Sequence, residues 1–210
     1  MQATDVLIVG CGDLGLEVAR LLLHADLSVC GLRRQTLNNV NFPMIAGDVT
    51  RPETLKALSE VNPKFLVYCV SANEQTDENY QQIYVQGLKN TLVGLAQASQ
   101  LQHVFFVSST RMYGQISDTL LDENHIAQPA DFGGMRLLEA EQYLHQSALD
   151  SHQWASTALR LTGIYGPGRT RMVNMANDLN RWPVANTWTN RIHRDDAAAF
   201  ILFLIGQVLA

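Results

Sequence analysis

An apolar segment that leads directly into closely spaced glycines constrains this chain more than any other feature. Val6 to Val9 precede Gly10, Gly12 and Gly15 in a Gly-x-Gly-x-x-Gly pattern, and the amphipathic segment Leu14 to His24 follows. A strand, a glycine turn and a helix in this order predict a site for a dinucleotide pyrophosphate. Gly10 permits the tight turn, Gly12 admits the phosphates and Gly15 allows close packing of the helix. A glycine turn without a ligand is the alternative interpretation.

The rest of this turn and the end of the next apolar segment supply further expected cofactor contacts. Cys11, Asp13 and Leu14 lie in the turn, where free N–H groups and the positive end of the helix dipole favour an anion. Arg33 and Arg34 stand where a fold that selects NAD presents an acidic residue to the ribose. Because guanidinium groups bind phosphate through forked hydrogen bonds, this pair favours NADP, with NAD as the other option. A solvated basic turn is the alternative.

Composition sets limits on the class of protein. The chain has 210 residues, of which 47% are hydrophobic and 17% charged, as in an ordinary globular protein. A net charge of -5 without a basic run argues against nucleic acid as a partner. Neither a membrane-spanning run nor a signal peptide is recognisable, so we expect no membrane partner and a cytoplasmic location. The three cysteines show no metal-ligand spacing, so neither a metal nor a disulfide is expected.

Strand-like and helix-like segments alternate along the chain, which predicts a parallel sheet covered on both faces. We therefore expect an α/β fold, a Rossmann-type doubly wound parallel sheet of about six strands with helices on both faces. The expected strands are Val6 to Val9, Ser28 to Leu32, Pro43 to Ala46, Phe65 to Cys69, His103 to Val107 and Ser156 to Leu161. The expected helices are Leu14 to His24, Pro52 to Ser59, Glu78 to Ser99, Met135 to Ser147 and Asp195 to Val208.

Two further loops at the carboxyl edge of the predicted sheet belong to the expected cofactor site. Asp48 and Val49 follow the third strand. Asp48 either accepts a hydrogen bond from the adenine amino group or caps the next helix, and the sequence favours neither. Val70, Ser71 and Ala72 follow the fourth strand, and their small side chains leave room for a ribose.

Four segments together carry a resemblance to a known family: Gly47 to Thr50, Val107 to Gly114, Leu159 to Arg169 and Ile192 to Asp196. They resemble the extended and atypical short-chain dehydrogenase/reductases, often called NAD-dependent epimerases/dehydratases, and the resemblance covers nearly the whole chain. It implies NAD(P) bound on a six- or seven-stranded sheet. It also implies hydride transfer to or from a sugar nucleotide or another small hydroxyl or carbonyl compound, in a cleft built largely by the C-terminal part.

The resemblance further implies a tyrosine that moves the hydroxyl proton and a lysine one helical turn later. In this sequence those positions hold Phe132 and Arg136. Phe132 cannot ionise, and loss of a general acid or base typically costs roughly a hundred- to ten-thousand-fold in rate. Arg136 keeps a positive charge for the nicotinamide ribose. Ser109 matches the family serine that hydrogen-bonds the reacting oxygen, and its alternative role is to satisfy the backbone at the end of a strand.

Other side chains with exchangeable protons are weaker candidates for the missing proton carrier. Tyr113, Tyr84 and Tyr165 lie in or near the family motifs, and each is more readily explained by packing. His125 lies in a polar loop and His193 lies beside two aspartates at the start of the last helix. We expect the former to be solvated and the latter to order its turn.

The expected organisation is a single NAD(P)-binding domain over residues 1–210, with a reduced substrate lobe at about 165–195. Relatives of the resembled family usually continue past the position of Asp196 into another strand and more helices, whereas this chain has 14 further residues. Part of the substrate cleft is therefore expected to be absent. The apolar residues from Phe200 to Leu204 make a homodimer a possible assembly.

Three functions are consistent with these observations. The first is an NADP-preferring reductase-like or epimerase-like enzyme that acts on a small-molecule substrate by hydride transfer. The second is an NADP(H)-binding sensor or regulatory protein without catalysis, which the substitution at Phe132 favours. The third is a folded remnant with neither activity. We take the enzyme as the leading hypothesis.

Overall fold

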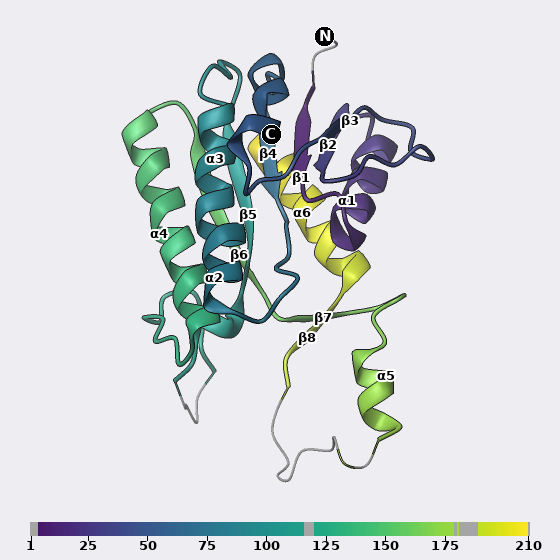
Figure 1. The fold of residues 1–210 in the computed structure, drawn as a ribbon, viewed down its shortest axis with the longest axis vertical. Coiled ribbons are helices and arrows are strands. Elements are labelled where there is room, and N and C mark those ends of the chain that lie inside the picture. Colours follow the sequence, from purple (N-terminus) through teal and green to yellow (C-terminus); the bar gives the residue numbers. More distant parts are fainter. Residues whose placement is uncertain (1–3, 116–119, 179, 181–188, 210) are drawn as a thin grey trace.

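The computed structural model describes residues 4–115, 120–178, 180 and 189–209 (Figure 1). Its centre is a six-stranded parallel sheet in the order β3-β2-β1-β4-β5-β6. The strands are β1 (Val6–Val9), β2 (Val29–Arg33), β3 (Met44–Ala46), β4 (Phe65–Tyr68), β5 (His103–Ser109) and β6 (Ala155–Leu161). This order reverses direction between β1 and β4, as in dinucleotide-binding folds, and the predicted Rossmann-type fold class is confirmed.

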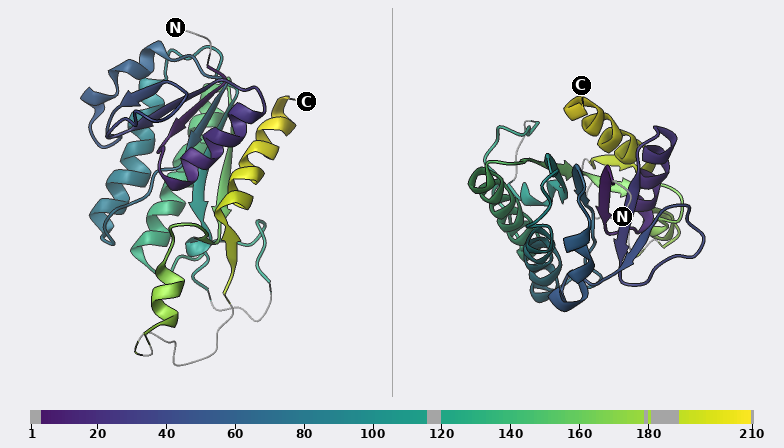
Figure 2. Two further views of the ribbon diagram at one scale, coloured as in Figure 1. Left: turned by 90° about the vertical axis from the view of Figure 1, so that its right-hand side faces the viewer. Right: turned by 90° about the horizontal axis from the view of Figure 1, so that it is seen from above.

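Helices cover both faces of the sheet (Figure 2). On one face lie α1 (Asp13–His24) and α6 (Arg194–Leu209), which pack against each other. On the other face lie α3 (Gly87–Gly94) and α4 (Phe132–Ser151). Each face has its own core cluster of buried apolar residues, so the sheet is shielded from water on both sides.

The strand β1 explains why the sheet is central. All four of its residues are fully buried. Successive side chains of a strand point to opposite faces, so Val6 and Ile8 join the core under α1 and α6, while Leu7 and Val9 join the core under α3 and α4. A continuous apolar run is therefore what this strand requires.

The predicted helix from Glu78 to Ser99 is divided in the structure. It consists of α2 (Asp77–Tyr80), a π-helical stretch η3 (Gln81–Gln86) and α3, which ends at Gly94. The hydroxyl of the buried Tyr68 donates a hydrogen bond of 2.6 Å to the carbonyl of Ile83, an acceptor that an α-helix would use itself. A side chain that enters the helical ladder in this way shifts its hydrogen bonding.

Two other segments also differ from the expectation. The predicted helix from Pro52 to Ser59 forms two short 3₁₀ helices, η1 (Pro52–Thr54) and η2 (Lys56–Glu60).

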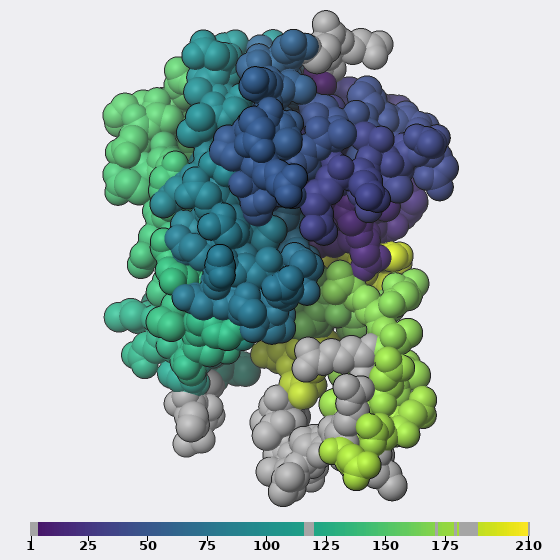
Figure 3. Space-filling model, in the orientation of Figure 1, coloured from purple at the N-terminus to yellow at the C-terminus, as the bar shows by residue number. Residues whose placement is uncertain are grey.

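Beyond the carboxyl edge of the sheet, β7 (Gly163–Tyr165) pairs in parallel with β8 (Arg191–His193), and α5 (Arg171–Ala176) lies between them in the chain. Neither these strands nor this helix was predicted. In Figure 3 this part projects below the main body. No helix in the described part is long and apolar enough to cross a membrane.

A buried ion pair connects α4 to the sheet. Glu141 of α4 is only 2% exposed, and its carboxylate lies 2.9 Å from the guanidinium of Arg160 in β6. The same guanidinium donates to the hydroxyl of Tyr113. The two ions thereby satisfy each other where water has little access.

Replacing Glu141 with alanine is expected to destabilise the fold, because it leaves the charge of Arg160 partly buried without a carboxylate. We expect a loss of about 3 kcal/mol in the free energy of unfolding, measured by urea denaturation. The matched control is Glu139→Ala, which removes the more exposed carboxylate that pairs with Arg136. That change should cost less than about 1 kcal/mol, and equal losses in the two variants would contradict this account.

Candidate functional site

A cavity of about 1100 Å³ opens at the carboxyl edge of the sheet, where the strand order reverses. The loops after each of the six strands, β1 to β6, contribute to its walls. In α/β sheets of this kind ligands bind at this reversal. The predicted site residues that line the cavity are Gly10, Cys11, Gly12, Asp13, Leu14, Arg33, Arg34, Asp48, Val49, Val70, Ser71 and Ser109. Gly15, Ala72, Phe132 and Arg136 were also predicted and do not line it.

The three glycines of the loop after β1 differ in the space that surrounds them. Gly10 has φ +101°, and a Cβ atom there would lie 2.6 Å from the backbone nitrogen of Val70. At Gly15 a Cβ would lie 2.4 Å from the carbonyl oxygen of Gly10, so glycine lets α1 start close to β1. At Gly12 nothing lies within 4 Å. Gly10 and Gly15 therefore serve the fold, whereas Gly12 borders open space in the cavity.

The start of α1 carries a balanced set of charges. The carboxylate of Asp13 pairs with Nε of Arg169 at 2.7 Å and with Nη1 of Arg194 at 2.9 Å. Burial would raise the pKa of Asp13, but the hydrogen bonds from these two arginines outweigh burial and the pKa is lowered. The acidic side chain is thus neutralised, and the helix N-terminus stays favourable for an anion.

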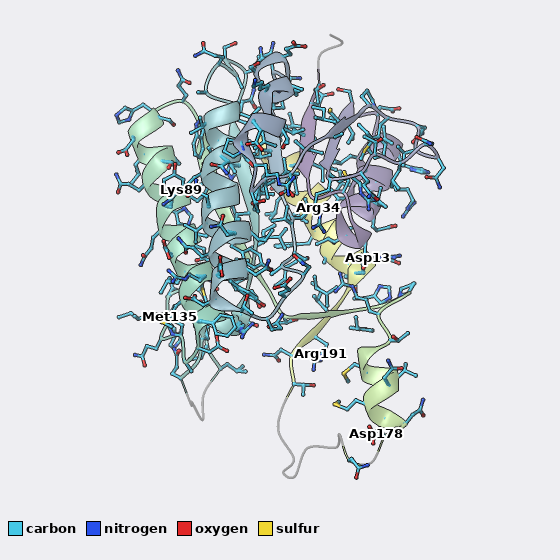
Figure 4. The ribbon with its side chains drawn as sticks, in the orientation of Figure 1. Asp13, Arg34, Lys89, Met135, Asp178 and Arg191 are labelled. Atoms are coloured by element: carbon cyan, nitrogen blue, oxygen red, sulfur yellow. The ribbon has the colours of Figure 1, made fainter. Side chains whose placement is uncertain are left out.

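The loop after β2 contributes cations to the cavity wall. Arg33 is half-buried and Arg34 is exposed, and neither side chain has a hydrogen bond or ion pair with another residue in the part described. Figure 4 shows Arg34 and Asp13 close to the start of α1, which places this loop beside the glycine turn. The two guanidinium groups are therefore available to a negatively charged ligand.

Of the two loops predicted to face the adenine and ribose, the one with Asp48 and Val49 lines the cavity, and the other lines it through Val70 and Ser71 but not Ala72. Asp48 lines the cavity, and its Oδ1 accepts hydrogen bonds from the backbone N–H and hydroxyl of Thr50, at 2.9 and 2.8 Å. It therefore closes its own turn and does not cap η1, which begins after Arg51. Ala72 does not line the cavity, and its N–H donates to the hydroxyl of Tyr84 at 3.4 Å.

The residues predicted for catalysis are separated. Ser109 faces the cavity, and its Oγ accepts a hydrogen bond of 3.2 Å from the N–H of Arg111, which is the backbone role considered above. Arg136 is held by Asp77, with N–O distances of 2.7 and 2.9 Å, and by Glu139 at 2.8 Å. Its neighbour Met135 lies at the lower end of α4 in Figure 4, far from Asp13 and Arg34.

The weaker proton-carrier candidates occupy varied places. Tyr84 and Tyr165 line the cavity. Tyr113 does not line it, since its hydroxyl contacts Arg160 and the carbonyl of Asp122. His125 pairs with Asp122. His193 accepts from the N–H of Asp195 at 3.2 Å, consistent with a role in ordering the turn into α6.

Sequence reasoning missed a polar group on the cavity wall that combines Arg111 and Tyr80. Nη1 of Arg111 donates to the hydroxyl of Tyr80 at 2.7 Å, and Nε contacts both oxygens of Asp131 at 3.1 and 3.0 Å. The guanidinium hydrogen bond lowers the pKa of Asp131, which also caps α4 by accepting from the N–H of Gly134. The only signal in the sequence was a charged residue inside the motif from Val107 to Gly114.

Comparisons with known proteins agree with this geometry. The model of the NAD dependent epimerase/dehydratase family matches residues 6–208. A solved structure from Methylobacillus flagellatus, named as an NAD-dependent epimerase/dehydratase, is 48% identical in sequence. It has a TM-score of 0.84 and covers 98% of this chain and 71% of its own. No curated protein matches the chain.

More distant solved structures share the fold. UDP-glucose 4-epimerase of Thermus thermophilus, in complex with NAD, is 18% identical, with a TM-score of 0.80 over 96% of this chain and 74% of its own. UDP-glucose 4-epimerase of Thermotoga maritima, with UDP-glucose, is 17% identical, with a TM-score of 0.81 over 96% and 73%. At this level of identity the likeness concerns the fold alone.

Substitution of Gly12 separates binding from folding. Since no atom lies within 4 Å of an added Cβ, Gly12→Ala should keep the melting temperature of the parent. The methyl group would still occupy the space that a phosphate needs, so NADPH affinity measured by calorimetry should fall about tenfold or more, roughly 1.4 kcal/mol. The matched control is Gly206→Ala in α6, which also has open space around it. Equal affinity in the two variants would contradict a phosphate site at Gly12.

Proposed function

Since this chain belongs to the NAD dependent epimerase/dehydratase family, we propose that it binds a nicotinamide dinucleotide in the large cavity and exchanges hydride with a small substrate. The residues fit the cofactor in two ways. Open space at Gly12 beside the start of α1 suits a pyrophosphate. The cavity then passes the small loop residues Val70 and Ser71 and reaches Ser109.

We propose NADP as the preferred cofactor. The observation that carries this is that Arg33 and Arg34, on the cavity wall at the end of β2, have no carboxylate partner among the residues that the structure describes. A ribose 2′-phosphate would supply the anion that both guanidinium groups lack, through charge-assisted hydrogen bonds. The Thermus thermophilus epimerase was solved in complex with NAD, but it is only 18% identical to this chain. Its cofactor therefore does not decide between NAD and NADP here.

The substrate proposed is a sugar nucleotide or another small hydroxyl or carbonyl compound. The large cavity continues to the segment after β6, and a second cavity of about 610 Å³ shares Tyr165, Arg169, Met172 and Arg191 with it. Arginines beside apolar side chains suit a ligand that has both anionic and apolar parts. UDP-glucose, the ligand in the Thermotoga maritima structure, combines an anionic diphosphate with a planar uracil ring that can stack on such side chains.

In the proposed reaction the chain positions the reacting oxygen of the substrate through Ser109. The dinucleotide supplies or accepts the hydride at its nicotinamide when it is bound. Ser109 lies on the cavity wall, where its hydroxyl can donate a hydrogen bond to the reacting oxygen while its Oγ accepts from Arg111. Residues 1–210 as one NAD(P)-binding unit, a homodimer and a cytoplasmic location stay predictions from the sequence.

The arginine pair gives the direct test of NADP preference. Arg33→Ala and Arg34→Ala should each weaken NADPH binding about tenfold, roughly 1.4 kcal/mol, and leave NADH binding within about twofold, by calorimetry. Arg51→Ala, an exposed arginine outside the cavity, is the matched control and should change neither. An unchanged ratio of NADPH to NADH affinity in both variants would remove the argument for NADP.

A second candidate function is a cofactor-responsive protein without turnover. Phe132 has no ionisable group, and Arg136 is held away from the cavity by Asp77 and Glu139. Such a protein must bind its partner or a second copy with different affinity when cofactor is present. Sedimentation with and without saturating NADPH should then show different oligomer populations. Identical sedimentation together with steady NADPH oxidation would support the enzyme instead.

A further inference from the structure

A tyrosine outside the family motif occupies the wall of the cavity beside Phe132. Tyr80 is 7% exposed, lines the cavity and packs edge-on against Phe132 with ring centroids 5.4 Å apart. Its ring also lies 5.1 Å from that of Tyr84. A phenol is therefore held against the residue that takes the place of the expected proton carrier.

The local backbone accounts for this position. Thr76 caps α2 by accepting from the N–H of Asn79 at 3.2 Å, and Tyr80 ends this helix. The π-helical stretch η3 begins at the next residue, and Tyr80, Ile83 and Tyr84 all line the cavity. π-helical turns occur frequently at functional sites because they change which side chains share a face.

The hydroxyl of Tyr80 has a cation as its nearest partner. It accepts the 2.7 Å hydrogen bond from Nη1 of Arg111 and donates to Oε1 of Gln75 at 3.2 Å. The guanidinium carbon lies 5.1 Å from the centroid of the Tyr80 ring and 5.3 Å from that of Phe132. A charged N–H donor therefore already contacts the oxygen from which a proton would leave.

Arg111 is itself fixed in place by the fold. Asp131 holds its guanidinium, and at Gly133 a Cβ atom would lie 2.4 Å from the guanidinium carbon, so glycine there makes the space that Arg111 fills. The backbone N–H of Arg111 also contacts Oγ of Ser109. Arg111 thus contacts the hydroxyl groups of both Ser109 and Tyr80, two residues that line the cavity.

We propose that Tyr80 is the proton donor of this site and that Arg111 is its positioning residue, an inference that rests on the proposed hydride-transfer function. In the reducing direction, the substrate carbonyl carbon gains the hydride that NADPH loses on becoming NADP⁺. The carbonyl oxygen gains the proton of the Tyr80 hydroxyl, so that an alcohol forms. The phenolate left at Tyr80 is held by Arg111 and regains a proton from water.

The first arm of the test is a single-atom deletion. Tyr80→Phe keeps the ring contacts with Phe132 and Tyr84, so the melting temperature should match that of the parent. NADPH affinity should stay within about twofold of the parent. Oxidation of NADPH with a panel of aldehydes, ketones and nucleotide sugars should fall about a hundredfold or more. Tyr143→Phe, in α4 outside the cavity, is the matched control and should keep the parental rate. Arg111→Lys keeps the charge and should retain more activity than Arg111→Gln.

The second arm does not depend on turnover. Nitration by tetranitromethane, mapped by mass spectrometry, should modify both Tyr80 and Tyr143 in the free protein. Saturating NADPH should protect Tyr80 and leave Tyr143 unchanged.

The outcomes separate this inference from the proposed function. A parent that does not bind NADPH fails the proposed function, and the role of Tyr80 falls with it. A parent that binds NADPH without turnover fails the proposed hydride transfer, and the role of Tyr80 falls with that function. A parent that oxidises NADPH overturns the role of Tyr80 alone if Tyr80→Phe keeps the parental rate, or if NADPH leaves nitration of Tyr80 unchanged.

Discussion

Parallel pairing of β1 with both β2 and β4 is the constraint on which the site depends. Val6 pairs with Val29 on one side and with Phe65 on the other, so the chain proceeds outward in opposite directions from this strand. The loops that leave β1 and β4 must therefore separate, and the cavity lies between them. Close approach of these loops at their origin is also what excludes a side chain at Gly10, where a Cβ would meet the backbone of Val70.

The distribution of charge follows from this arrangement. The start of α1 meets the segment after β7 and the start of α6, so Asp13 is paired by Arg169 and Arg194 from distant parts of the chain. Arg33 and Arg34 receive no such carboxylate among the described residues, although the chain as a whole has a net charge of -5. Unpaired cations in an acidic protein, on a cavity wall, are a specific local feature, and the proposed NADP preference is based on it.

At the reacting end, Phe132 and Arg136 each have a defined set of contacts. Phe132 presents an apolar ring where the family resemblance implies a phenol, and that ring packs against Tyr80 and Arg111. Arg136 is meanwhile satisfied by carboxylates away from the cavity. In the proposed role, Tyr80 supplies the proton from α2, whereas the tyrosine that the resemblance implies would supply it from α4. Arg111 is then the positive charge next to the proton donor. If the protein binds the cofactor without turnover, the contacts among Phe132, Tyr80 and Arg111 serve packing alone.

The sequence by itself determined the sheet, the glycine loop and the main helices, because buried strands, helical periodicity and glycine turns are local properties of the chain. Only the tertiary structure decided which polar groups meet. Tyr68 reaches Ile83 across 15 residues and divides the long helix, Arg111 reaches Tyr80 across 31, and Arg136 reaches Asp77 across 59. The pairing of β7 with β8 likewise joins distant segments. Such contacts depend on how separate elements pack, and no local pattern encodes them.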